Sequence, residues 1–259
     1  KEMRIDSHAH GQPSWQNDPK LYVEQCRQGG IDGLLLIAKL EDCLEGIKRF
    51  GDFVIPVLTV NIDRAGVREI EEGIRAGCKG IKFIQPRAPY SDERYWPLYE
   101  TLEKLGVPAV FHTGYLMMFE ERELHPTHIE HMRAAEICTI SRRFPNLKIL
   151  MAHFSNPWWE EAWKISTSRP NVYVDLSGGT AYRRAIRMWA EMYAPDGNLL
   201  KDSISKLCFG TDTGYFHDKP HKFAPYIAFY EKLFDAIGLD AAMREQVNSG
   251  NIRKLFLGT

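Results

Sequence analysis

Two histidines separated by one residue, His8 and His10, stand near the start of the chain and are suited to metal chemistry. In an extended strand the side chains alternate between the two faces, so both imidazoles point the same way. Two imidazoles on one face can grip a divalent metal ion such as zinc. The alternative is a pair of strand-end histidines that are hydrogen-bonded in the core, and further ligands elsewhere in the chain must decide between the two.

The segments that must position these histidines alternate between short apolar runs and helical patterns. Strands are predicted over residues 4–10, 33–38, 53–60, 80–84, 107–112, 147–153, 172–175 and 206–210. Short buried strands that alternate with helices indicate a parallel sheet. For 259 residues, the pattern predicts an α/β fold, a closed (β/α)8 TIM barrel that forms a single domain over residues 1–259, with an open doubly wound sheet as the second choice.

Polar side chains gather where these predicted strands end. In barrels of this kind the active-site groups project from the C-terminal ends of the strands. Those ends carry His8, His10, Lys82, His112, His153 and Asp212. Because a random placement would scatter these residues over both ends and the helices, the constellation predicts a functional site at one rim.

The same pattern resembles the amidohydrolase superfamily. The resemblance is carried by Asp6-x-His8-x-His10 after the first strand, by a histidine after the fifth and the sixth, and by Gly-Thr-Asp212 after the eighth. The final segment Asn251-Ile-Arg-Lys-Leu-Phe256 is most similar to the amidohydrolase-related group. That group includes aminocarboxymuconate semialdehyde decarboxylase and other metal-dependent decarboxylases and hydrolases.

The resemblance implies one divalent metal ion, zinc ahead of manganese, with His8, His10, His112 and Asp212 as its ligands. It also implies that Asp212 accepts a proton from the metal-activated water. His153 matches a histidine that stays off the metal and hydrogen-bonds this water. A structural hydrogen bond for His112 or His153 and a turn-forming role for Asp212 are the alternatives.

Two further residues of the rim have roles that the sequence leaves open. Asp6 is expected to orient a histidine rather than to bind the metal. Lys82 could be carboxylated and bridge two metals, as in some members of the superfamily. It could also remain unmodified and bind a substrate carboxylate or pair with Asp212, or it could form a salt bridge inside the barrel. We favour an unmodified lysine beside the site.

A second group of histidines could form another metal site. His125, His128 and His131 recur at intervals of three and could share one helix face. However, Thr127-x-x-Glu130 matches a capping box, so a helix over 127–144 that begins at the barrel mouth is the simpler prediction. His217 and His221 are expected to be solvated loop residues or substrate contacts.

Substrate contacts are expected from the loops that follow the strands. The candidates are Lys82, Arg87, Tyr115 and Trp158. The same loops also carry Trp15, Tyr90, Arg94, Met117, Met118, Phe119, Trp159, Tyr215 and Phe216. Aromatic rings with a few arginines indicate a small, partly apolar substrate that can be anionic, although such rings often only pack loops onto a barrel.

Three functions are compatible with these residues. The first is a metal-dependent hydrolase that uses a metal-activated water on an ester, lactone or amide bond of a small substrate, which can bear a carboxylate. The second is a non-oxidative decarboxylase on the same site, and the third is a barrel that binds a ligand without catalysis.

The amino-acid composition and net charge limit the classes of binding partner that we expect. The formal net charge is -1 and no polybasic run occurs, which argues against nucleic acid and anionic membranes. Five cysteines without a Cys-x-x-Cys pair suit reduced thiols, and no signal peptide or long apolar span is recognised, so we expect a cytoplasmic protein. A small-molecule substrate is expected as partner, and a homodimer is left open.

Overall fold

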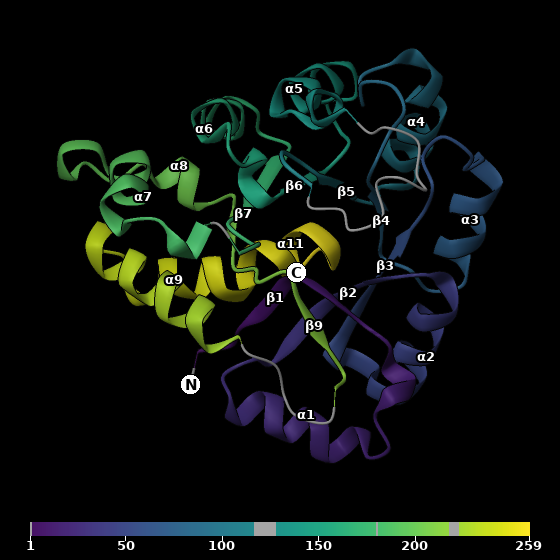
Figure 1. Ribbon diagram of the computed structural model, residues 1–259, viewed down its shortest axis with the longest axis horizontal. Helices are drawn as coiled ribbons and strands as arrows, with labels where there is room; N and C mark the ends of the chain where they lie inside the picture. The colour runs from purple at the N-terminus through teal and green to yellow at the C-terminus, as the bar shows by residue number, and fades with distance from the viewer. Residues whose placement is uncertain (1, 117–127, 180, 218–222) are drawn as a thin grey trace.

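The computed structural model describes residues 2–116, 128–179, 181–217 and 223–259. Its strands form one parallel sheet in the order β8-β7-β6-β5-β4-β3-β2-β1-β9, which curls into a ring (Figure 1). The predicted α/β fold, a TIM barrel, is confirmed. The strands are β1 (Ile5–Gly11), β2 (Gly33–Ala38), β3 (Val54–Thr59), β4 (Gly80–Phe83), β5 (Ala109–His112), β6 (Ile149–Ala152), β7 (Val172–Asp175), β8 (Leu207–Cys208) and β9 (Thr213–Tyr215).

Helices α1 to α7 lie outside this ring and follow one another round it in Figure 1. Several have local start and stop signals. The side chain of Asp18 caps α1 by accepting a hydrogen bond from the backbone N–H of Leu21, and Gly106 ends α4 in a left-handed conformation. The helices are α1 (Pro19–Gln28), α2 (Leu40–Phe50), α3 (Val67–Arg75), α4 (Trp96–Leu105), α5 (Ala134–Arg143), α6 (Trp159–Ser168), α7 (Ile186–Tyr193), α8 (Lys201–Ile204), α9 (Ala224–Ile237), α10 (Ala241–Glu245) and α11 (Asn251–Phe256).

The eighth strand differs from the prediction over residues 206–210. It is divided into β8, which pairs with β7, and β9, which pairs with β1. The residue between them that breaks the strand is Asp212, whose backbone is left-handed with φ 63°. A left-handed residue cannot continue a strand, and the short Thr-Gly-Tyr segment after it carries no apolar run that would have predicted β9.

The segment between β8 and β9 closes the ring against β1. The backbone N–H of Ser7 donates to the carbonyl oxygen of Phe209 (2.9 Å), and the N–H of Asp212 donates to the carbonyl oxygen of His8 (2.8 Å). Ring closure therefore places Asp212 directly beside the histidines of the first strand.

The predicted helix over 127–144 is interrupted. A 3-10 turn covers Ile129–Met132, Arg133 is extended (φ -72°, ψ 155°), and α5 begins only at Ala134. Thr127, the expected cap, lies outside the described residues. Likewise, the predicted helix over 240–256 is composed of α10, a π-helical turn over Gln246–Gly250 and α11.

Alternation along the strands separates two apolar clusters. The larger one joins the sheet to the surrounding helices. The smaller one lies within the ring, where α11 crosses the middle in Figure 1, and comprises Ile5, Leu35, Ile37, Ile55, Val57, Val110, Leu150, Ala152, Tyr173, Cys208, Ile252, Leu255 and Phe256. Because side chains repeat every two residues on one face, Lys82, His112 and Asp175 share the inner face with this cluster.

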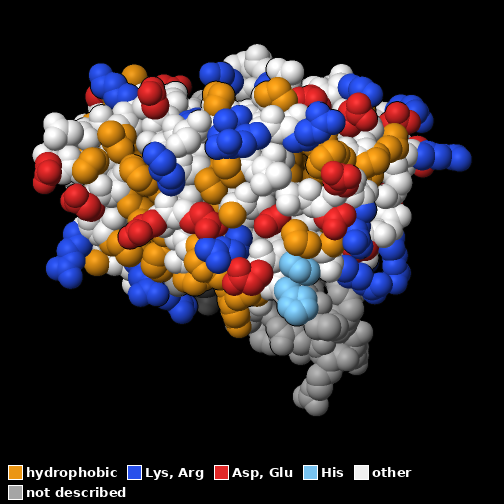
Figure 2. Space-filling view, turned by 90° about the horizontal axis from the view of Figure 1, so that it is seen from above, with side chains coloured by type: hydrophobic (Ala, Val, Ile, Leu, Met, Phe, Trp, Pro, Cys, Tyr) orange, Lys and Arg blue, Asp and Glu red, His pale blue; other side chains and the backbone are white. Residues whose placement is uncertain are grey.

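The outer surface is mixed in charge. On the face that Figure 2 shows, Lys and Arg side chains are interspersed with Asp and Glu, in keeping with the net charge of -1. None of the helices in the described ranges is long and apolar enough to cross a membrane.

Candidate metal centre

The residues predicted for the metal site converge at one end of the ring. His8 and His10 belong to β1, His112 ends β5, His153 directly follows β6, and Asp212 lies between β8 and β9. His8, His112 and His153 are buried, whereas the side chain of His10 is 44% exposed. The side of the site formed by His8, His112 and His153 is thus shielded from solvent, whereas the side at His10 is open to it.

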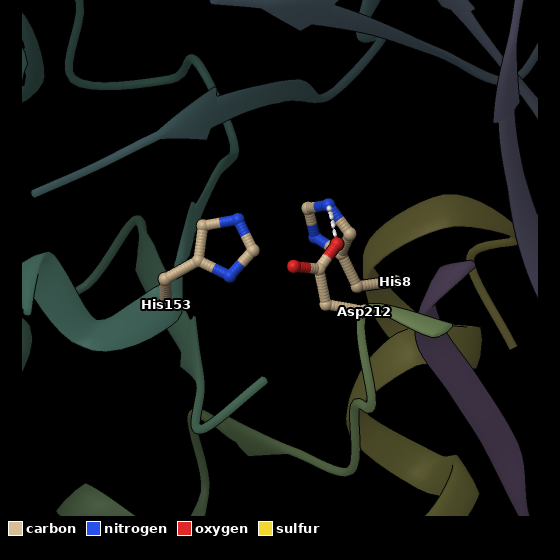
Figure 3. Close-up of side chains that lie close together, drawn as sticks. All are labelled: His8, His153 and Asp212. Atoms are coloured by element: carbon tan, nitrogen blue, oxygen red, sulfur yellow. Dashed lines mark ion pairs between the residues drawn. The ribbon is translucent and has the colours of Figure 1, made fainter. Parts of the chain in front are cut away.

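Left-handed backbone turns two of these side chains toward each other. His153 has φ 67° and is followed by Phe154 and Ser155 at 48° and 50°, while Asp212 has φ 63°. Residues other than glycine rarely adopt this conformation, and functional sites are where such strain concentrates. Figure 3 shows the result, with His153 facing His8 and Asp212 from the opposite side of the site.

Three of these residues form a compact group. One ligand atom each from His8, His153 and Asp212 lies within 4.8 Å of the other two, which is a spacing that could hold a metal ion. Nε2 of His8 is 3.5 Å from Oδ1 of Asp212. The ring of His112 contacts that of His153, with centroids 4.6 Å apart. The group includes His153, which we predicted to stay off the metal, and the ligand roles remain predictions.

His10 shows why the group suits a cation. Its Nδ1 lies 3.1 Å from the carbonyl oxygen of Ile37, which can only accept a hydrogen bond, so this nitrogen carries the proton. In the neutral ring the lone pair of Nε2 then faces Oδ1 of Asp212 at 3.2 Å. Two acceptors at this distance require a cation between them, either a proton or a metal ion.

The surroundings of His8 are a second indication that the group suits a cation. The buried Nδ1 of His8 has no hydrogen-bond partner among the residues that the structure describes, and Oδ2 of Asp175 is 3.7 Å away. Buried polar atoms normally have partners. An imidazole that is free at one nitrogen and faces a carboxylate with the other suits a cation-binding role. The residues present therefore fit a divalent ion.

The protonation states agree with this role. Burial, reinforced by neighbouring positive groups, lowers the pKa values of His8 and His112 well below the usual range, and burial also lowers that of His153. Burial alone would raise the pKa of Asp212, but the neighbouring imidazoles outweigh it and hold this pKa below its usual range. Neutral imidazoles and an ionised carboxylate are the forms that bind metals.

Lys82 lies beside the group. Its Nζ is 3.4 Å from Nε2 of His8, and its side chain is buried. Burial lowers its pKa to about 8, although Asp212 and Asp175 act in the opposite direction. The position agrees with the expected lysine beside the site.

Asp6 has a different role from the one expected. Its carboxylate accepts from Thr211 N–H (2.9 Å), Thr211 Oγ1 (2.6 Å), Tyr215 OH (2.8 Å) and His8 N–H (3.0 Å). It contacts the backbone of His8 rather than an imidazole. Asp6 therefore fixes the segment that carries Asp212 against the first strand.

Sequence reasoning missed a second buried carboxylate, Asp175, at the end of β7. It accepts hydrogen bonds from Ser7 Oγ (3.2 Å), the backbone N–H of His153 (3.0 Å) and the N–H and Oγ of Ser177 (3.0 and 2.5 Å). The signal was present, because Asp175 ends a predicted strand as the other site residues do. Ser177 had no such signal, since it lies in the following loop.

The predicted substrate residues are spread around the mouth. Arg87 is exposed, and its backbone N–H bonds the carboxylate of Asp63. Tyr115 is 56% exposed and its carbonyl oxygen contacts Nε2 of His112 at 3.3 Å. The ring of Trp158 is covered by the guanidinium of Arg133 at 4.6 Å.

Several other loop residues pack instead of facing solvent. Tyr90, Tyr215 and Phe216 are fully buried, so their predicted substrate role is wrong and the packing alternative holds. Trp15, 46% exposed, contacts the ring of His217. Met117, Met118, Phe119 and His221 lie outside the described residues.

The second histidine group is only partly described. The rings of His128 and His131 are 5.1 Å apart, and Nδ1 of His131 contacts the carbonyl oxygen of Pro86 at 3.4 Å. His125 lies outside the described residues. Within the described part of the chain, the groups of three or more metal-ligating side chains do not include these histidines.

Comparison with known sequences gives one family. A family model described as amidohydrolase matches residues 38–257, a range that begins after His8 and His10 and contains His112, His153 and Asp212. No curated protein matches the sequence.

Solved structures give the same fold. An uncharacterized TIM-barrel protein from Bordetella bronchiseptica has a TM-score of 0.71 at 17% identity, over 98% of both chains. 5-Carboxyvanillate decarboxylase from Sphingomonas paucimobilis has 0.67 at 13% over 99% of both. A probable 2-pyrone-4,6-dicarboxylic acid hydrolase from Acinetobacter baumannii, solved with citric acid bound, has 0.66 at 12% over 98% of both.

Proposed function

Because this chain belongs to the amidohydrolase family, we propose that it is a metal-dependent hydrolase. It acts on an ester, lactone or amide bond of a small substrate that can bear a carboxylate. The observation that carries the proposal is a group of side chains that could hold a divalent cation: one ligand atom each from His8, His153 and Asp212 lies within 4.8 Å of the other two, and Nε2 of His10 is 3.2 Å from Oδ1 of Asp212. The neutral imidazoles of His8 and His153 complete the surroundings expected of such a cation.

The proposed ligands are His8, His10, His112 and Asp212, holding one divalent ion, with zinc ahead of manganese. When bound, the ion would polarise a carbonyl group and lower the pKa of water toward neutrality. A dihydroxybenzoic acid decarboxylase from Polaromonas sp. JS666, similar in fold at 15% identity and a TM-score of 0.63, contains bound manganese. Manganese is therefore the second ion to test.

The chain's own side chains supply the proton transfers. Asp212, ionised and 33% exposed at its side chain, can accept a proton from the attacking water. His153 is neutral and faces Asp212, so its ring can pass that proton to the leaving group. Burial of His8, His112 and His153 keeps competing water out of one side of the site.

Decarboxylation is the second candidate, and the position of Lys82 is compatible with it. Its buried Nζ lies 3.4 Å from Nε2 of His8, on the inner face of the barrel. A cation in this place can pair with a substrate carboxylate, which either reaction could use. Several of the fold's neighbours are decarboxylases by name, but their low identities to this chain support no choice between the reactions.

A substrate panel separates these functions. The purified protein is freed of metal with a chelator and reloaded with zinc or manganese. Lactones, esters and amides are then compared with aromatic and unsaturated carboxylic acids, whose decarboxylation is followed by release of CO2. Acid production from a lactone or an ester supports the hydrolase, and CO2 release without hydrolysis supports the decarboxylase. Failure to bind about one equivalent of either metal would contradict both and favour a ligand-binding barrel.

The five cysteines are free, four of them buried. Free thiols are in keeping with a reducing compartment, and a cytoplasmic location is part of the proposal.

A further inference from the structure

We propose that Ser177 and Asp175 hold the ring of His153 in one tautomer, with its proton on Nδ1 and the lone pair of Nε2 facing the metal centre. Both are positioning residues, because they act through His153. The role of the Nε2 lone pair in the reaction rests on the proposed function. The tautomer of His153 itself can be measured without any substrate.

Two contacts at Nδ1 of His153 define the tautomer. Oγ of Ser177 lies 2.9 Å away, and the carbonyl oxygen of the same residue lies 3.4 Å away. A carbonyl oxygen can only accept. The nitrogen that faces it must therefore be the protonated one.

The hydroxyl of Ser177 points to the same assignment independently. It has a single proton, and its strongest contact is with Oδ1 of Asp175 at 2.5 Å. A carboxylate only accepts hydrogen bonds, so the hydroxyl proton goes to Asp175. The oxygen of Ser177 is then left with lone pairs only and accepts from Nδ1–H of His153.

Asp175 is itself fixed from several sides. Its Oδ1 also accepts from the backbone N–H groups of His153 and Ser177, and its Oδ2 accepts from Ser7 Oγ. All of these donors are buried. The carboxylate is therefore held as an acceptor toward Ser177. The hydrogen bonds then run from Nδ1–H of His153 to Oγ of Ser177, and from that hydroxyl to Asp175.

Local backbone brings the partners together. His153 is left-handed, at φ 67°, directly after β6, which carries its ring across to the end of β7. Gly178, with φ 92°, lets the loop after Ser177 turn close to this ring, and a Cβ placed there would lie 3.4 Å from Nδ1. The loop thus wraps the protonated side of the imidazole.

The consequence concerns the other nitrogen. With the proton on Nδ1, Nε2 can bind a metal ion or accept a proton, and it is oriented by a buried hydrogen bond as metal-site histidines usually are. In the opposite tautomer Nε2–H would point at the site and could do neither.

The test is a tautomer measurement by NMR on the metal-free, ¹⁵N-labelled protein. Long-range ¹H–¹⁵N correlations distinguish Nδ1–H from Nε2–H rings, and a His153→Gln variant identifies the signals of His153. The expected wild-type result is a single Nδ1–H ring. In Ser177→Ala this signal is expected to become a mixture of tautomers, whereas Ser177→Thr, which keeps the hydroxyl, retains the wild-type pattern.

Zinc binding provides a second readout. Because His153 is not one of the proposed ligands, Ser177→Ala is expected to keep the zinc affinity of the wild type, measured by competition with a chromophoric chelator, which shows that the variant is folded with its metal site intact. Ser166→Ala is the matched control, since Ser166 is a buried serine whose hydroxyl bonds the carbonyl oxygen of Trp163 in α6.

An Nε2–H ring in the wild type, or an unchanged single tautomer in Ser177→Ala, would overturn the proposal. If the tautomer behaves as expected but no substrate is turned over, only the proposed function fails. If turnover requires metal but the tautomer is wrong, only the role of Ser177 and Asp175 fails.

Discussion

Nε2 of His10 lies 3.2 Å from Oδ1 of Asp212, although the other nitrogen of the same ring already donates to the carbonyl oxygen of Ile37. Neither partner can supply a hydrogen bond while the imidazole is neutral. The pair therefore marks the position at which the protein has to accommodate a positive charge.

Replacing Asp212 by Asn tests this position directly. The amide can donate to Nε2 of His10 and so removes the need for a cation. We expect loss of stoichiometric metal, measured by elemental analysis, and a fall in turnover of about 10²–10⁴. Asp202→Asn, an exposed aspartate in α8, is the control and should change neither. Full metal content and activity in the Asp212→Asn protein would rule out both proposed roles.

His112→Ala tests the ligand taken from the fifth strand. Nε2 of His112 contacts the carbonyl oxygen of Tyr115 at 3.3 Å, which leaves the lone pair of Nδ1 free for a metal. We expect metal affinity to fall at least about 10-fold, with a parallel loss of turnover. His128→Ala, matched in residue type, should keep its metal because that ring contacts His131 instead. Survival of both metal content and turnover in His112→Ala would show the assignment to be wrong.

Lys82→Met is expected to stabilise the metal-free protein. Burial lowers the pKa of Lys82 from 10.5 to about 8, so at pH 7 the folded state carries the cost of a buried charge. Removal of that charge should raise the free energy of unfolding by on the order of 1–3 kcal/mol, as measured by urea denaturation.

The lowered pKa of Lys82 also predicts how the free energy of unfolding changes with pH. Below about pH 8, Lys82 is protonated in both states and the cost is fully present. Between about pH 8 and 10.5 the folded state has lost the proton that the unfolded state still binds, so the free energy of unfolding rises with pH. This rise should be absent in Lys82→Met and present in Lys79→Met, whose lysine is exposed. Equal pH profiles for wild type and Lys82→Met would contradict the burial argument.

Gly114→Ala is expected to destabilise the fold around the site. Gly114 has φ 84°, and an added Cβ would lie 2.2 Å from the backbone oxygen of Asn156. Backbone must therefore move between the ends of β5 and β6, at a cost of about 2–4 kcal/mol in the free energy of unfolding. Gly250→Ala is the control, because its φ of -60° is helical and its nearest neighbours are at 3.7 Å or more. Similar stabilities for the two variants would show that the loop can relax.

The sequence was informative where chemistry depends on regular strands. His8, His112 and Lys82 could be placed together because alternation and parallel pairing fix where a strand-end side chain points. Asp212 and His153 were also identified, although their left-handed backbone lies just beyond the strands and was not foreseen.

What the sequence could not supply depends on contacts between loops. Ser177 follows a strand by two residues, and nothing in its neighbours indicates a hydrogen bond to an imidazole on the preceding strand's loop. The same holds for Asp6, whose partner Thr211 is 205 residues away. The ninth strand was missed because hydrogen bonding to β1, not local apolar pattern, makes it a strand.

The long sequence separation between Asp6 and its partner Thr211 has a consequence for biosynthesis. Because Asp212 lies 204 positions after His8 in the sequence, it can join His8 only after the whole segment between them has been made. Closing the ring pairs residues so distant in sequence that loop-closure entropy is overcome late, by the same hydrogen bonds that assemble the site. A nascent chain therefore contains His8 and His10 before the proposed ligand set is complete, and we expect cation binding to coincide with completion of the barrel.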